Sequence, residues 1–281
     1  TKAAGLLDTW YPSIHLTSGD VNGDGWPDIF VNAIGGTNRL YINKRDGTFS
    51  EEGEKRGVAQ GTPVGFSTWM FDYDNDGDLD IVSANFAMSG KKFLGSFGSY
   101  RPESFSVDQA PADAFQPSAL YKNDGTGNFE NVSIKAGIIP SSVMGAQFMD
   151  IELDGDLDII LGPGSHPLEN MQPLFVYRND GNDTFTNITP VGDPRYYGKL
   201  HGMAFADVDR DGDPDLYVSN GGGLLSDRGR DMYLENKTEG AHWLHIKLEG
   251  TKSNRSAIGA RVSVHVGDRV LMQEVAAGQV F

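Results

Sequence analysis

The stretch Asp72-Tyr73-Asp74-Asn75-Asp76-Gly77-Asp78-Leu79-Asp80 decides how this chain folds, because versions of it occur four times. The other copies are 20–28, 150–158 and 207–215, and all four fit the pattern D-x-[DNE]-x-D-G-x-x-D. Side chains with oxygen atoms stand at positions 1, 3, 5 and 9, and Gly stands at position 6. These are the first nine positions of a calcium loop, in which Gly makes the sharp turn and position 7 offers its carbonyl oxygen. A single copy could be a solvated acidic turn, but closely spaced carboxylates repel one another unless a cation lies among them. Four copies therefore predict bound calcium.

The predicted calcium ligands are the residues at positions 1, 3, 5, 7 and 9 of each copy. The copy 150–158 departs from the pattern because it has Glu at position 3, whose longer side chain would crowd the ion. We therefore expect three to four Ca²⁺ ions, which stabilise turns and take no part in catalysis. The full set is Asp20, Asn22, Asp24, Trp26 and Asp28; Asp72, Asp74, Asp76, Asp78 and Asp80; Asp150, Glu152, Asp154, Asp156 and Asp158; and Asp207, Asp209, Asp211, Asp213 and Asp215.

The calcium affinity expected of the loops also indicates the compartment in which the protein works. None of them has the bidentate Glu at position 12, so we expect modest affinity, about 10⁻⁵–10⁻³ M, as in extracellular modules. Cytosolic calcium would leave such sites unfilled. This predicts an extracellular or periplasmic protein.

The composition excludes several classes of function. The formal net charge is -16, which disfavours nucleic acids and anionic membranes as partners. Of the 39 acidic residues 18 lie in the four loops, so nearly half of the acidic residues are explained as calcium ligands. The chain has no Cys, which excludes disulfides and thiolate chemistry. It has no run of eighteen apolar residues, and we expect no membrane span.

Short strands surround each loop in a repeating order. An apolar run precedes the loop, at 14–16, 69–71, 147–149 and 203–205, and a β-type run follows it, at 28–31, 80–82, 158–161 and 215–218. A third run carries an apolar-Tyr pair with Asn shortly after, at 40–43, 120–123 and 176–179, and more loosely at 232–236. A tight turn and a Phe follow three of these runs, at Phe49, Phe129 and Phe185. Repeated units of four short antiparallel strands are typical of propeller blades. We predict an all-β chain: a β-propeller of four-stranded antiparallel blades with calcium-binding hairpin loops.

The spacing between loop starts is uneven, at 52, 78 and 57 residues, which indicates an insertion at about 86–117. This segment combines aromatic with basic residues, a combination that suits recognition of a protein partner or a sugar ring. A loop packed on itself is an equal alternative. The candidate partner-binding residues are Phe93, Phe97, Tyr100 and Arg101, with His166 on a second excursion at 162–171.

The last section of the chain differs from the rest. Apolar residues alternate at 243–248, 260–266 and 270–275, which predicts three more strands without an acidic loop. They would complete a blade or form a small β cap. We expect two domains, 1–240 and 241–281. Residues 3–6 resemble the steps at 57–58 and 137–138, which follow the Phe of a blade, and the chain stops at 280–281 inside strand-like sequence. We therefore expect a part of a longer chain and a partial ring.

At these residues the chain resembles known families. The four loops with their strands resemble the FG-GAP/VCBS repeats, also seen in integrin α-subunit propellers. The tail, through 242–244, 250–255, 258–262 and 274–275, resembles the ASPIC/UnbV domain. The resemblance implies a secreted propeller with calcium at the blade hairpins. Related domains serve mostly in adhesion and in protein or glycan binding, and some are carbohydrate-active lyases or dehydratases.

Three functions remain open at this point. The first is a calcium-stabilised binding or adhesion module, with a protein or a glycan as partner. The second is a carbohydrate-active enzyme on the same scaffold, and the third is a structural subunit of a larger extracellular assembly. We predict no catalytic residue, because no Ser-His-Asp order, G-x-S-x-G, P-loop or dinucleotide fingerprint occurs in the sequence.

Overall fold

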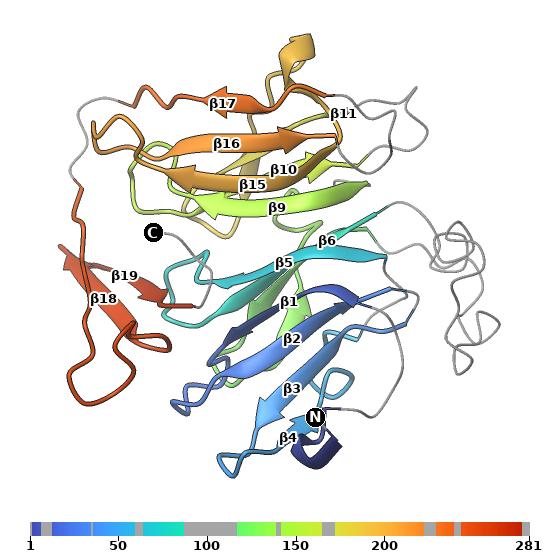
Figure 1. Cartoon of the computed structure of the whole chain (residues 1–281), viewed down its shortest axis with the longest axis vertical. Helices are drawn as coiled ribbons and strands as arrows, with labels where there is room; N and C mark the ends of the chain where they lie inside the picture. Colours follow the sequence, from blue (N-terminus) through green and yellow to red (C-terminus); the bar gives the residue numbers. More distant parts are fainter. Residues whose placement is uncertain are drawn as a thin grey trace. The chain divides into compact units, whose positions relative to one another are not determined.

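The computed structural model describes residues 2–6, 13–34, 36–59, 64–86, 117–138, 142–164, 172–221, 229–238 and 243–276. The chain forms two compact units. The first comprises Thr1–Met70, Leu79–Ile134 and Ile139–Met144, and the second comprises Phe71–Asp78, Lys135–Ile138 and Gly145–Phe281. Nearly all regular elements are short strands (Figure 1). No helix in the described part is both long and apolar enough to cross a membrane.

The first unit is built mainly on two four-stranded antiparallel sheets, preceded by the 3-10 turn η1 (Lys2–Ala4). One sheet contains β1 (Ser13–Gly19), β2 (Asp28–Ala33), β3 (Arg39–Asn43) and β4 (Phe49–Glu51), hydrogen-bonded in that order. The other contains β5 (Gly65–Phe71), β6 (Asp80–Asn85), β7 (Ala119–Asn123) and β8 (Phe129–Asn131). Each sheet is a blade in which neighbours in sequence are neighbours in space.

The second unit repeats this plan. One blade contains β9 (Val143–Met149), β10 (Asp158–Pro163), β12 (Phe175–Asn179) and β13 (Phe185–Asn187). The next sheet has three strands in the described part, β15 (Leu200–Ala206), β16 (Asp215–Asn220) and β17 (Met232–Leu234). Two small sheets complete the unit, β11 (Gln172–Pro173) with β14 (Tyr197–Gly198), next to η3 (Pro194–Tyr196), and the hairpin of β18 (Arg261–Val266) and β19 (Arg269–Glu274).

The predicted strands are confirmed in kind and order around all four acidic loops, and the all-β class with four-stranded antiparallel blades is confirmed with them. The tail differs from expectation in one segment. Residues 243–248 form no strand, and β18 pairs with β19 as a separate sheet, which favours the small cap over a completed blade. Trp243 and Leu244 are more than half exposed. Apolar alternation makes a strand only where another strand takes up the backbone groups.

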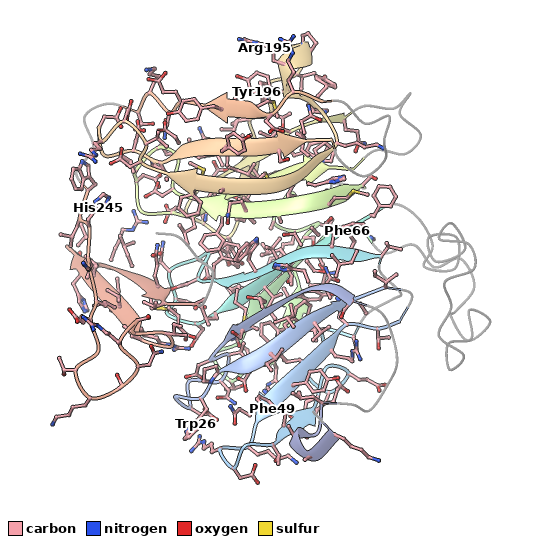
Figure 2. The ribbon with its side chains drawn as sticks, in the orientation of Figure 1. Trp26, Phe49, Phe66, Arg195, Tyr196 and His245 are labelled. Carbon is pink, nitrogen blue, oxygen red and sulfur yellow. The ribbon has the colours of Figure 1, made fainter. Side chains whose placement is uncertain are left out.

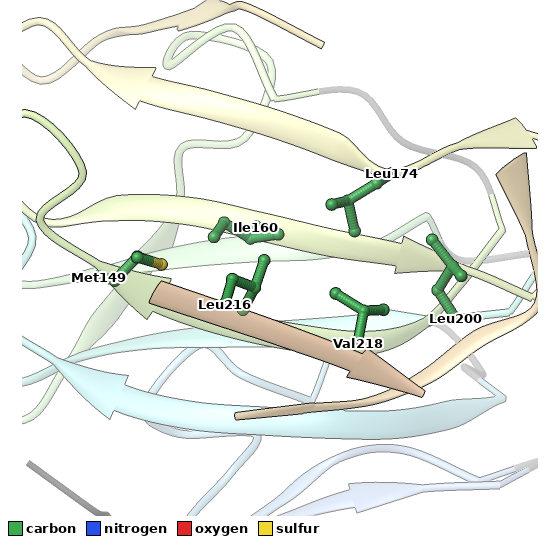
Figure 3. Packing of buried hydrophobic residues seen from close by; sticks show 6 residues of the cluster. All are labelled: Met149, Ile160, Leu174, Leu200, Leu216 and Val218. Atoms are coloured by element: carbon green, nitrogen blue, oxygen red, sulfur yellow. The ribbon is translucent and has the colours of Figure 1, made fainter. Parts of the chain in front are cut away.

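The core lies between the sheets of each unit, because the strands bury apolar residues on both faces. In the first unit Phe30 of β2 lies 6.5 Å from Tyr121 of β7, measured between ring centroids. Phe66 and Phe86 make an edge-to-face contact at 6.0 Å in a smaller cluster with Ile34 and Val64 (Phe66 is labelled in Figure 2). In the second unit the core cluster joins the blade of β9–β13 to the sheet of β15–β17. Its buried members are Met149, Ile160, Leu174, Leu200, Leu216 and Val218 (Figure 3).

The tyrosine of the third strand is displaced by one residue in the last sheet. Tyr41, Tyr121 and Tyr177 pair with Ile29, Ile81 and Ile159, the first residues after the closing Asp of each loop. In the last sheet Leu234 takes that place, opposite Leu216, and Tyr233 pairs with Tyr217. A shift of one residue moves a side chain to the opposite face of a sheet. Tyr41, Tyr121 and Tyr177 are accordingly buried, whereas Tyr233 is half exposed.

Candidate metal sites

The four acidic loops share one backbone conformation. In each loop the residue at position 4 and the Gly at position 6 have positive φ. The position-6 glycines have φ between 84° and 101°. Left-handed backbone is costly for most residues, so its presence at Leu153 and Arg210 shows that the loop as a whole imposes it. The residues at position 4 are Gly23, Asn75, Leu153 and Arg210, and those at position 6 are Gly25, Gly77, Gly155 and Gly212. The sequence repeat is therefore a conformational repeat.

Backbone N–H groups hold the first and last carboxylates inside the loop. In the loops 20–28, 72–80 and 150–158 the carboxylate at position 1 accepts from the N–H groups of positions 5 and 6, at 2.7–3.1 Å. In the loops 20–28, 150–158 and 207–215 the carboxylate at position 9 accepts from the N–H of position 2 and from an Asn N–H in the third strand or just after it, at 2.7–3.2 Å. The carboxylates are thus oriented before any ion arrives.

Two loops bring their carboxylates close together. Asp72, Asp74 and Asp80 place one oxygen each within 4.8 Å of one another. Asp207, Asp209 and Asp211 do the same. Asp72 and Asp80 are 2% and 0% exposed. Hard oxygen donors in such a cluster suit Ca²⁺, so these two loops could each hold a metal ion.

Two buried oxygens in the loop 207–215 support a cation there. The Oδ1 atoms of Asp207 and Asp213 are buried and have no hydrogen-bond partner within the described part of the chain. A buried carboxylate oxygen without a partner is costly. A cation coordinated by Asp207 would remove the cost at that residue.

Burial raises the pKa of the carboxyl groups that anchor three of the loops. Desolvation is the main cause, and it raises the pKa of Asp72 to about 7, of Asp158 to about 8, and of Asp28 and Asp150 to about 6. Neighbouring carboxylates act in the same direction. Groups taken out of water next to other acids carry their negative charge at a cost. A bound cation removes this cost, so the electrostatics of the loops fit a metal.

The loops 20–28 and 150–158 carry arginine side chains on their acids. Arg45 lies 3.0 Å from Asp24 in the first of these loops. In the second, Arg178 lies 3.5 Å from Glu152, and Arg269 pairs with Asp156. Neither loop brings three carboxylates together as the other two do. In the loop 20–28, Asn22 contributes to this difference, because its amide stands at position 3, where the clustered loops have Asp74 and Asp209.

An Asn at the end of the third strand links neighbouring loops, a role that the sequence did not reveal. Its backbone N–H binds the position-9 carboxylate of its own loop, as Asn123 does with Asp80 at 2.8 Å. Its side-chain amide donates to the position-2 carbonyl of the preceding loop, from Asn123 to Val21 at 2.8 Å and from Asn236 to Ile151 at 2.8 Å. The recurrence of this Asn in every repeat was the available signal. Because the bonds cross between strands distant in sequence, the sequence could not supply their partners.

A second feature lies on the outer face of the sheet β15–β17. Tyr217 and Tyr233 lie side by side across the strands, each 48% exposed. The hydroxyl of Tyr217 donates to Asp231 at 2.7 Å, and that of Tyr233 donates to Asp215 at 2.8 Å. The matching pair in the first blade, Phe30 with Leu40, is fully buried. This face therefore presents two oriented aromatic rings next to carboxylates.

The predicted partner-binding residues of the two excursions are not placed by these observations. Phe93, Phe97, Tyr100, Arg101 and His166 lie outside the described residues.

Comparison with known proteins finds a family whose model matches part of the repeat. A family model described as an FG-GAP-like repeat matches residues 20–83 and 165–218. These two segments are similar to FG-GAP-like repeats. The matched segments include the acidic loops 20–28, 72–80 and 207–215, and the loop 150–158 lies outside them. That loop is the copy with Glu at position 3.

Curated relatives match this chain over most of its length. It is 22% identical over 240 residues to cartilage acidic protein 1 of Homo sapiens and 24% identical over 244 residues to that of Xenopus tropicalis. Each alignment covers 85% of this chain but 32% and 33% of the relative. The chain thus spans about a third of the length of the curated relatives it matches.

Solved structures match more distantly. The biofilm matrix protein Bap1 of V. cholerae has a TM-score of 0.40 at 14% identity, and covers 73% of this chain and 24% of its own. The rhamnogalacturonan lyase YesW has a TM-score of 0.41 at 18% identity, and covers 80% of this chain and 42% of its own.

Proposed function

We propose that this chain is the calcium-stabilised propeller part of a secreted protein that binds a protein or a glycan. The observation that carries the calcium part is the four-fold repeat of one loop conformation, with its carboxylates turned inward by backbone N–H groups. Ca²⁺ is the cation that fits hard oxygen donors in a flexible loop. Each ion would hold the turn between the first two strands of a blade.

The calcium would have a structural role. The loops join neighbouring strands, and the Asn bonds tie each loop to the one before it. An ion in one loop would therefore stabilise its own hairpin and the next blade together. The modest affinity expected for nine-residue loops fits millimolar extracellular calcium, which supports secretion. Residues 241–281 would form the ASPIC/UnbV-like segment of this protein, following the repeats of 1–240.

The proposal that this protein binds a partner rests on the face of the sheet β15–β17 that exposes Tyr217 and Tyr233. Exposed tyrosines with their hydroxyl groups held by carboxylates offer a rigid apolar surface with hydrogen-bond acceptors at its edge. Such surfaces are typical of protein and sugar contacts. The residues of the two excursions, which include Tyr100 and His166, stay candidates for the same contact.

Two measurements test the proposal. Thermal unfolding with excess EDTA and with millimolar calcium tests the metal, and an unchanged melting curve would refute it. A glycan array and a panel of extracellular matrix proteins test the binding, with Tyr217→Ala and Tyr233→Ala as variants. We expect each variant to lose a ligand that the wild type binds. Ile134→Ala, which removes another exposed apolar side chain, should bind normally.

A further inference from the structure

Residues of the tail, 243–276, rest on two of the four acidic loops. The methyl groups of Leu271 lie 3.1 Å from the place of a Cβ on Gly155, and the indole nitrogen of Trp243 lies 1.7 Å from the place of a Cβ on Gly212. Both glycines hold position 6 of their loops. At Gly25 and Gly77, the same positions of the other loops, no atom of the described residues lies within 4 Å of the place of a Cβ. At position 6 the tail therefore contacts the third loop, 150–158, and the fourth loop, 207–215, but not the first two.

A charged contact joins the tail to the third loop, 150–158. One nitrogen of the Arg269 guanidinium donates to the carbonyl oxygen of Asp154 at 2.8 Å, and another pairs with the carboxylate of Asp156. Asp156 is 9% exposed and also accepts from the amide of Asn75 at 2.7 Å. A forked guanidinium contact of this kind is directional as well as strong.

The tail has the burial pattern of a docked element. In β19 the side chains of Met272 and Glu274 are buried, while Val270 and Gln273 are exposed. Glu274 is paired across the hairpin with Arg261 at 3.2 Å. An isolated two-stranded hairpin is marginally stable in water, so contacts outside the hairpin are needed to hold it.

The third loop receives positive charge from arginines on two sides. Arg178 approaches Glu152, and Arg269 approaches Asp156 and the backbone of Asp154. A guanidinium about 6 Å from a divalent cation weakens its binding by about tenfold even at the dielectric constant of water. The residues that fasten the tail thus make this loop a poor calcium site.

We propose that residues 243–276 dock on the third and fourth acidic loops, and that the guanidinium of Arg269 is the cation that the loop 150–158 takes in the docked state. Calcium at this loop and docking of the tail then oppose each other. Because such coupling is reciprocal, each weakens the other by the same factor. The docking stands independently of the proposed function, whereas the opposition to calcium rests on it.

Hydrogen–deuterium exchange on the full chain without calcium tests the docking. We expect Arg269→Gln to speed amide exchange across 261–276 by about tenfold, because a hydrogen bond to a charged group is lost. Exchange in β1–β4 should stay at the wild-type rate, which shows that the fold is intact. Arg255→Gln is the matched control, since it removes another arginine ion pair of the tail, to Glu249 at 2.9 Å. Wild-type exchange of 261–276 in Arg269→Gln would overturn the docking.

A calcium titration by calorimetry tests the opposition. In Arg269→Gln the weakest calcium site should tighten by about tenfold, and adding Asp150→Asn should abolish this gain, which assigns it to the third loop. Equal affinities in the wild type and Arg269→Gln would overturn the opposition. If neither protein binds calcium, the proposed function and the opposition both fail, and the exchange experiment alone decides the docking.

Discussion

The side-chain amide of Asn179 donates a hydrogen bond of 2.7 Å to the carbonyl oxygen of Tyr73, which lies in the acidic loop of the preceding blade. The same amide also donates to Leu157 in its own loop at 3.2 Å. The backbone N–H of Asn179 donates to the Asp158 carboxylate at 2.7 Å. One residue thus connects two loops that are far apart in sequence.

Loss of the Asn179 side chain should destabilise the protein. In Asn179→Ala the buried carbonyls of Tyr73 and Leu157 lose their donor, which costs about 1–3 kcal/mol. Urea unfolding at equilibrium measures this. Asn43→Ala is the matched control, because the Asn43 amide donates to Pro27 of its own loop at an exposed position. Equal losses in the two variants would show that the bond between loops contributes nothing.

Calcium should stabilise the wild type by about 2.7 kcal/mol at a concentration one hundred times the dissociation constant of one site. Asp72→Asn keeps the size of the side chain but removes a charge from the cluster of Asp72, Asp74 and Asp80. We therefore expect a smaller rise in melting temperature with calcium in this variant. Asp268→Asn, an exposed residue of the last hairpin, should respond to calcium as the wild type does. A full response in Asp72→Asn would exclude this loop as a site.

Acidification should weaken the first unit through His15. Burial lowers the pKa of His15 below 6.5, and its Nδ1 atom accepts a hydrogen bond from the Thr68 N–H at 3.2 Å. A depressed folded-state pKa contributes stability that is present above 6.5 and is lost as the pH falls below it. Between pH 7 and pH 5, the wild type should therefore lose more stability than His15→Gln. Parallel losses, measured by urea unfolding at each pH, would contradict this assignment.

The glycines at position 6 offer a matched pair of substitutions. Gly77→Ala and Gly212→Ala both place a Cβ on left-handed backbone, at φ of 93° and 101°, which costs about 1–2 kcal/mol. Only at Gly212 does the Cβ meet a side chain, that of Trp243. Gly212→Ala should therefore be the more destabilising of the two and should alter tryptophan fluorescence. Equal unfolding free energies would show that the Trp243 contact is without energetic consequence.

Much of the fold follows from local sequence. The acidic nonapeptides, the apolar runs beside them and the Asp-Gly turns fix strand positions, because hairpin turns and strand propensity act over a few residues. The sequence also carries the shift at Tyr233. Tyr233 stands three residues before the Asn of its run, whereas Tyr41, Tyr121 and Tyr177 stand two before theirs, so Leu234 takes the equivalent place and Tyr233 turns to the exposed face. What the sequence of one strand does not contain is the partner strand that each side chain meets.

The sequence by itself determined the four calcium-type loops, their shared turn and the blade-like order of strands. The sequence also marked two copies as different, through Asn22 and Glu152 at position 3, but only the tertiary structure decided which loops gather their carboxylates. It brought three carboxylates together in the loops 72–80 and 207–215, and it placed Arg269 on Asp156, more than a hundred residues away along the chain. The physical reason is that a loop conformation depends on its own residues, whereas the charge that it meets depends on whichever distant side chains the fold brings beside it.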